Sequence, residues 1–154
     1  MNSPMFNLWA PPILNGFNLN GPDSPCIDDD GGYMWPANGG FQTLTAGQRL
    51  NGETITLDFM SDFVWMGFHW SFQSQATSSS GFLIRVMDDE GNYISPGLMH
   101  CFNMSGTQAV PFPIHPYIHF KSGQEIKFDI QNADLTFSQG FQLVFRGPKR
   151  YSKR

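Results

Sequence analysis

Four histidines are the residues of this sequence best suited to hold a metal ion, and two of them lie close together. His115 and His119 are four residues apart in the segment HPYIHF, whereas His69 and His100 stand alone. On a strand, residues i and i+4 face the same way but lie about 13 Å apart, which is too far for both to bind one ion. The spacing therefore predicts no metal site.

Two acidic clusters could bind a cation or act as paired carboxylates. Residues 28–30 are three aspartates followed by two glycines, and residues 88–90 read Asp-Asp-Glu before Gly91. The first cluster lacks the D-x-D-x-D-G-x5-E spacing of a calcium loop. The second falls in an expected hairpin turn, where Asp and Gly serve backbone geometry. We expect both clusters to be solvated turns.

The nucleophiles form no recognisable catalytic set. Ser78, Ser79 and Ser80 precede a glycine, but no G-x-S-x-G elbow is present, and no glycine-rich loop leads into a helix. Cys26 and Cys101 lack metal or redox spacing, which favours two buried thiols. We predict that the chain is not an enzyme and needs no cofactor; a hydrolase with a scattered site is the weakest alternative.

Charge is distributed unevenly along the 154 residues, which are enough for one domain. The formal net charge is −4, yet five basic residues fall within the last nine, which leaves four basic against 13 acidic residues in 1–145. The acidic body, and a pI near 5.4 for the whole chain, argue against a nucleic-acid partner. We expect residues 148–154 to form a basic tail that docks on an acidic patch of another subunit, or that only aids solubility.

Residues 1–40 are rich in Pro, Gly, Asn and Asp, which predicts an extended N-terminal arm. The arm is too apolar for a free linker, so it should dock on its own domain or on a partner. Its expected anchors are Phe6, Trp9, Ile13 and Leu14. Prolines interrupt its apolar residues and no basic segment precedes them, so we expect neither a signal peptide nor a membrane span.

Residues 41–147 show the period of short strands rather than helices. Alternation is clear in 53–59 and 125–130, and further strands are expected near 63–72, 81–88, 98–102, 116–120 and 141–145. About eight short strands, spaced by roughly ten residues, predict an all-β domain. The expected architecture is a jelly-roll-like β-sandwich of antiparallel strands.

The run FVWMGFHWSF at 63–72 is the most aromatic part of the chain. Strict alternation predicts a core face made of Val64, Met66, Phe68, Trp70 and Phe72, with a bulge or close backbone approach at Gly67. The alternative is that Trp65 or Trp70 is exposed and stacks on sugar rings, as in a carbohydrate-binding module.

The C-terminal stretch LVFRGPKRY at 143–151, preceded by IKFDIQNADLTFSQGFQ, resembles the carboxyl end of small virion structural proteins of tailed bacteriophages. Those proteins end in an apolar strand followed by F-R-G-x-K-R-[FY]. The segments SDFVWMGFHWS at 61–71 and FLIRVMDDEGNYISPG at 82–97 resemble the same group in order. The resemblance covers roughly residues 55–151; the N-terminal arm matches nothing in the group.

This resemblance implies a non-enzymatic particle component with a jelly-roll-like fold. The first expectation is a capsid decoration or cement subunit, made in the host cytoplasm and located in the virion; the alternative is a neck, collar or tail subunit. Its partners would be the major capsid protein or other virion proteins, with copies forming a trimer or ring, and no membrane. Arg146, Lys149, Arg150 and Tyr151 would form the docking tail. A carbohydrate- or receptor-binding β-sandwich is the rival from another class.

Overall fold

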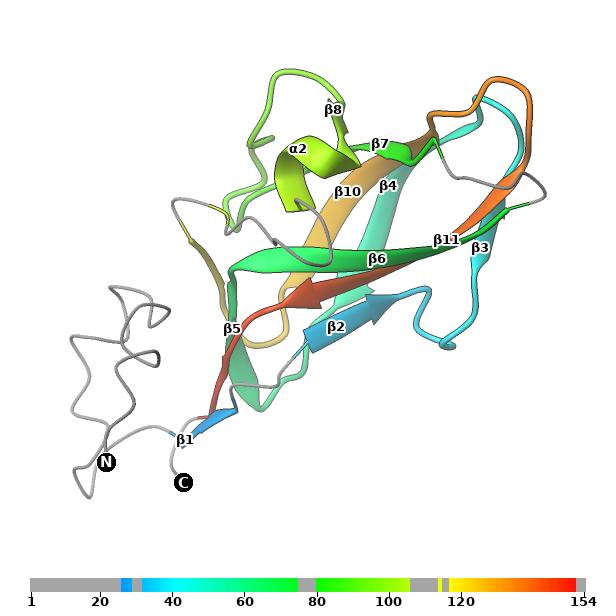
Figure 1. Ribbon diagram of the computed structural model, residues 1–154. Coiled ribbons are helices and arrows are strands. Elements are labelled where there is room, and N and C mark those ends of the chain that lie inside the picture. Colours follow the sequence, from blue (N-terminus) through cyan, green and yellow to red (C-terminus); the bar gives the residue numbers. More distant parts are fainter. Residues whose placement is uncertain (1–25, 29–31, 75–79, 106–113, 115–116, 152–154) are drawn as a thin grey trace, which may run out of the picture.

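The computed structural model describes residues 26–28, 32–74, 80–105, 114 and 117–151, and strands dominate this part of the chain (Figure 1). The strands are β1 Cys26–Asp28, β2 Gly32–Trp35, β3 Gln42–Leu44, β4 Arg49–Thr56, β5 Ser61–Trp65, β6 Gly67–Ser74, β7 Phe82–Val86, β8 Met99–His100, β9 Ile118–Phe120, β10 Glu125–Asn132, β11 Gln139–Arg146 and β12 Lys149–Tyr151. The helix α2, Cys101–Ser105, follows β8. Twelve strands are thus described where about eight were expected.

Two antiparallel sheets face each other and enclose the core. In one sheet β6 and β11 pair along their full lengths, and β2 and β3 lie end to end on the other edge of β11. The second sheet has the order β4-β10-β7-β8. Phe128 of β10 contacts both Trp35 of β2 and Phe145 of β11, with ring centroids 5.4 and 5.5 Å apart. The prediction of an all-β sandwich is confirmed.

A third sheet, β1-β12-β5-β9, extends from one end of the sandwich. It is continuous with the first sheet, because β5 runs into β6 and β11 runs into β12, as Figure 1 shows. The ladder bridges the junction: the Val64 amide donates to the Pro148 carbonyl at 3.1 Å and the Met66 amide to the Arg146 carbonyl at 2.9 Å. Proline fits here because its carbonyl, and not an N–H, completes the ladder.

A β-bulge bends the chain at this junction. Phe63 pairs with Lys149 and Gly67 with Arg146, so three residues on one strand oppose two on the other. Gly147 is pressed against the Val64 carbonyl, where a β-carbon would collide. The expected bulge at Gly67 therefore lies just before it, and the glycine that permits the close approach is on the partner strand.

The bulge changes which aromatic side chains enter the core. Trp65 and Phe68 are both buried, although strict alternation put them on opposite faces. Phe72, predicted to be in the core, is 43% exposed, and Met66 is only partly buried. The extra residue shifts the side-chain parity between β5 and β6, so Trp65 as well as Phe68 enters the core. Phe72 has the same parity as the buried Phe68, so this shift does not account for its exposure.

Two predicted boundaries need correction. The range assigned to the arm includes β1 and β2, and β2 pairs with β11 in the first sheet. The range assigned to the tail includes β12, which pairs with both β1 and β5. The expected arm anchors Phe6, Trp9, Ile13 and Leu14 lie outside the described residues. Gly147 and Pro148 bend the sheet rather than release a free tail.

Candidate functional site

The expected docking tail is folded, and its four predicted residues divide among different surroundings. Arg146 ends β11 with an exposed side chain whose Nη1 lies 3.4 Å from His69 Nε2. Because a guanidinium only donates, Nε2 must accept and His69 is neutral. Burial, followed by the Arg146 charge, lowers the pKa of His69. Tyr151 is partly buried at the end of β12.

Lys149 is committed to the fold rather than offered to a partner. Its ammonium donates to Asp58 Oδ2 at 3.0 Å and lies 4.1 Å from the centre of the Tyr33 ring, and only 15% of its side chain is exposed. The Tyr33 hydroxyl donates to the same oxygen at 3.1 Å. The hydrogen bond from Lys149 is the main cause that lowers the pKa of Asp58, and it outweighs the opposing effect of burial.

Arg150 lies on the opposite face of β12 and is partly buried. It is the Cα partner of Asp62 on β5. Asp62 also lies 3.4 Å from His119 Nε2 and accepts the backbone N–H of Ser122 at 2.9 Å. Of the four predicted tail residues, only Arg146 is exposed, and the other three are partly buried.

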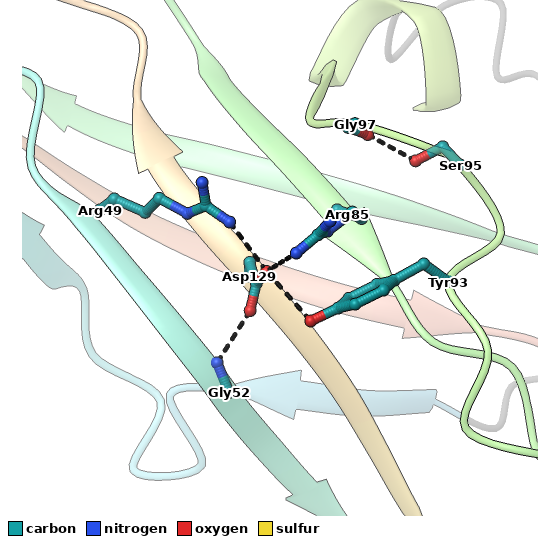
Figure 2. A network of polar contacts seen from close by, with 7 residues as sticks. All are labelled: Arg49, Gly52, Arg85, Tyr93, Ser95, Gly97 and Asp129. Atoms are coloured by element: carbon teal, nitrogen blue, oxygen red, sulfur yellow. Dashed lines mark hydrogen bonds and ion pairs between the residues drawn. The ribbon is translucent and has the colours of Figure 1, made fainter.

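A polar network that the sequence did not predict lies on the outer face of the second sheet (Figure 2). Asp129 of β10 is 2% exposed. Its Oδ2 accepts from Arg49 at 3.0 Å, from Arg85 at 2.7 Å and from the Tyr93 hydroxyl at 3.3 Å. The Arg85 guanidinium also lies 3.5 Å from the centre of the Tyr93 ring.

A second bulge supplies the fourth donor to this carboxylate. Phe128 pairs with Glu53 and Ile130 with Leu50, so Asp129 faces two residues of β4. Gly52 takes a φ of 70° there, which suits glycine, and its N–H donates to Asp129 Oδ1 at 2.9 Å. Burial alone raises the pKa of Asp129, but the hydrogen bonds from Arg85, Gly52 and Arg49 together lower it below its ordinary value.

This network joins elements rather than performing chemistry. Four donors occupy the carboxylate, so Asp129 is poorly placed to take a proton from a substrate. Through Arg85 and Tyr93 it ties the loop after β7 to the centre of the sheet, and Ser95 closes that loop by donating to the Gly97 carbonyl at 2.6 Å (Figure 2). The sequence signal was the alternation EIKFDI, which predicted only that Asp129 faces away from the core.

A buried pair of amides organises the turn between β10 and β11. Asn132 and Gln139 are fully buried. Asn132 Nδ2 donates to the carbonyls of Leu44, Thr45 and Phe137 at 2.9–3.2 Å, and its Oδ1 accepts from Gln139 Nε2 at 3.3 Å. The side chains of these two residues therefore fix the path of the turn.

Large apolar side chains are exposed at two ordered turns. Phe59, in the turn between β4 and β5, is 81% exposed, and Leu135, between β10 and β11, is 80% exposed. Met60 and Phe137, beside them, are also exposed. Phe59 and Leu135 have the largest exposed fractions of all large apolar residues in the described part of the chain.

The tryptophans and the cysteines lie in different surroundings. Trp35 and Trp65 are buried, whereas Trp70 is partly exposed beside Phe72 and Phe102. The Cys101 thiol is buried, which raises its pKa; the side chain of Cys26 lies outside the description. Among the described residues, no three His, Cys, Asp or Glu side chains form a group that could hold a metal ion.

In the described part of the chain, no helix is long and apolar enough to cross a membrane. No protein-family model, curated protein or solved structure matches this chain.

Proposed function

We propose that this chain is a structural subunit of a tailed-bacteriophage virion, in the first place a decoration or cement subunit on the capsid surface. It would stabilise the particle through contacts with the major capsid protein or other virion proteins and with copies of itself in a trimer or ring. The resemblance of the 143–151 segment to such proteins supports the class. The neck, collar or tail of the same virion is the alternative location.

The observation that carries the proposal is the display of apolar side chains on ordered turns. Phe59 and Leu135 each remain about four-fifths exposed although neighbouring backbone groups are hydrogen-bonded. A binding interface needs a central cluster in which an aromatic or aliphatic side chain is buried against the partner. A subunit that works through protein contacts needs such groups, whereas an enzyme needs a set of reactive groups that face one another.

The tail motif acquires a different meaning within this proposal. Three residues of the motif, Gly147, Pro148 and Lys149, take part in contacts at the junction between the sheets. The resemblance of the motif therefore supports a fold shared with those virion proteins. Arg146 remains the tail residue best placed to dock on a carboxylate of a partner. The apolar arm anchors Phe6, Trp9, Ile13 and Leu14 would supply a second contact.

A test begins with particles of the phage that encodes the chain. Quantitative mass spectrometry of gradient-purified particles should find the chain in a copy number set by the particle's symmetry. Particles that lack it should release DNA at a lower temperature, and added purified chain should restore the original temperature. Absence of the chain from purified particles would refute the proposal.

The rival carbohydrate-binding function has one feature in its favour. Trp70 lies 5.5 Å from Phe102 between ring centroids, and both Phe72 and Phe102 are exposed, which gives an aromatic surface formed by β6 and α2. Binding to a glycan array that is lost in a Phe102→Ala variant would support this alternative. No binding to any glycan would leave the structural role as the better proposal.

A further inference from the structure

Arg146 and His69 form a pair of basic side chains on the outer face of the first sheet. In the register of β6 and β11, His69 lies opposite Val144. Arg146 lies opposite Gly67, which has no side chain, so the guanidinium can turn along the sheet toward His69. Its Nη1 lies 3.4 Å from His69 Nε2. The sheet thus holds side by side two groups that can both carry positive charge.

No carboxylate of the described residues neutralises this pair. Four other cationic side chains in the described part of the chain form ion pairs with Asp or Glu, whereas the polar partner of the Arg146 side chain is His69. Acidic partners are not scarce, because the sequence has 13 acidic against nine basic residues. Arg146 is also exposed, so it keeps its capacity to bind a carboxylate from outside the chain.

The other described side chains around His69 carry no charge. Those on its face of the sheet are Gly67 and Ser71 of β6, Gln142 and Val144 of β11, and Gly32 and Met34 of β2. α2 also packs against β6, and its one titratable group is the buried thiol of Cys101. Among the described residues, Arg146 is therefore the charged group that faces His69. Burial, followed by this charge, lowers the pKa of His69.

A carboxylate that approaches the pair reverses this balance. A negative charge within about 4–6 Å favours the charged form of a histidine and so opposes the effect of Arg146. Protonated His69 has two N–H donors and no acceptor, so its Nε2 no longer accepts from Arg146 and donates to the carboxylate instead. Nitrogens 3.4 Å apart are close enough for both to form hydrogen bonds with the same carboxylate.

We propose that Arg146 and His69 together bind an Asp or Glu side chain of a partner protein, and that His69 takes up a proton from solvent when this carboxylate binds. The contact is then strongest at mildly acidic pH, where His69 gains its proton and the partner carboxylate is still ionised. The inference deepens the proposed structural role and rests on it for the claim that the partner is a virion protein. The binding chemistry itself belongs to the purified chain.

NMR titration of the histidine side chains tests the pair in the full chain, with a hexaglutamate peptide at low salt as the probe. In the wild type, the peptide should raise the pH at which His69 titrates. His119 is the internal control, because its Nε2 already lies 3.4 Å from Asp62 and should respond less. In the Arg146→Gln chain, His69 should titrate at a higher pH before any peptide is added, and the peptide should shift it little.

The affinity for the same peptide at two pH values tests the uptake of the proton. A site that gains a proton on binding binds more tightly as the pH falls, and the wild type should bind about threefold more tightly at pH 5.5 than at pH 8. The probe stays largely ionised there, because the ordinary pKa of Glu is about 4.3. His69→Gln keeps an acceptor for Arg146 but takes up no proton, so it should lose this pH dependence. His119→Gln is the matched control and should keep it.

A further variant excludes a carboxylate of the chain itself. Asp30 lies outside the described residues but is two positions before Gly32, which pairs with Arg146. Asp30→Asn should bind the peptide and titrate at His69 as the wild type does. Circular dichroism should show the wild-type fold in every variant, because none of the substituted residues belongs to the described core.

The inference is overturned by a peptide that leaves the His69 titration unchanged, by Arg146→Gln binding like the wild type, by His69→Gln keeping the full pH dependence, or by Asp30→Asn shifting the His69 titration. A chain that fails these tests but is present in purified particles loses this inference and keeps the proposed function. A chain that passes them but is absent from particles keeps its carboxylate site and loses the proposed function.

Discussion

At the scale of single residues, the stability of the second sheet depends on Asp129. Its carboxylate is buried, and it accepts hydrogen bonds from two arginines, one tyrosine and one backbone amide. Removing one member of a buried charged network leaves a buried charge without its partner, which strongly destabilises a protein. Replacing the whole network by apolar side chains is often nearly neutral by comparison. Asp129 is therefore the polar side chain whose loss should cost most.

The substitution Asp129→Asn should lower the free energy of unfolding by about 2–3 kcal/mol, because charge-assisted bonds to both arginines are lost. Urea unfolding measures this. Lys127→Ala is the matched control: Lys127 is on the same strand, and its side chain is exposed, so it should leave the free energy nearly unchanged. Equal effects of the two substitutions would contradict the structural role of Asp129.

The pH dependence of that difference provides a second test. The folded-state pKa of Asp129 is lowered, so its contribution is complete above its unfolded pKa of about 3.9 and is lost as the pH falls through the lower folded value. The difference in unfolding free energy between wild type and Asp129→Asn should be constant from pH 8 to about pH 5 and shrink below about pH 4. A difference that persists unchanged at pH 2.5 would contradict this assignment.

At the scale of the elements, the junction between the first and third sheets depends on Gly147. A β-carbon there would collide with the Val64 carbonyl, which is fixed in the ladder. Gly147→Ala should destabilise the fold by roughly 2–4 kcal/mol, because backbone rather than a flexible side chain must move. Urea unfolding again measures the effect.

Gly97→Ala is the control for this prediction. No atom lies within 4 Å of a β-carbon built at Gly97, and Gly97 does not have a positive φ. A nearly unchanged stability is expected there. If Gly147→Ala were equally harmless, the bulge could not depend on a close backbone approach.

The strands were predictable where the period of two was strong, as in the segments that became β4, β7, β10 and β11. Short strands escaped prediction: β1 and β2 lie among glycines and aspartates, and β12 follows a proline. Each of these strands pairs with residues that are far away in the sequence, and a local sequence pattern holds no information about such partners. In the aromatic run, Phe68 was predicted to be in the core and is buried, but Trp65 was placed on the other face and is buried too, because one extra residue in the bulge shifts the side-chain parity between β5 and β6.

The candidate site was less predictable than the fold. Four residues were expected to form one docking tail, but the alternation of β12 places Lys149 and Arg150 on opposite faces. The Lys149 ammonium donates to Asp58, which is 91 positions away in the sequence. The Asp129 network joins three strands and a loop. Contacts of this kind join residues that are far apart in the sequence. The exposure of Leu135 was equally hard to predict, because it depends on the turn that the buried Asn132 holds in place.

At the scale of the whole molecule, Arg146 and Lys149 should have separable roles. Arg146→Glu should weaken binding to particles about tenfold and reduce its dependence on salt, because an exposed cation is reversed. Lys127→Glu makes the same change on the other sheet and should bind normally. Lys149→Met should chiefly lower the melting temperature, because the ion pair between the Lys149 ammonium and the Asp58 carboxylate is lost. Equal binding by the Arg146→Glu and Lys127→Glu chains would contradict docking through Arg146.

Cryo-electron microscopy of intact particles would show whether the chain is a subunit of a virus particle, as we propose. We expect density for this sandwich at symmetry-related positions on the capsid, with the Phe59 and Leu135 turns in contacts between subunits. Density at the neck or tail would select the alternative location. Particles with no density for the chain, at capsid, neck or tail, would refute the proposed structural role.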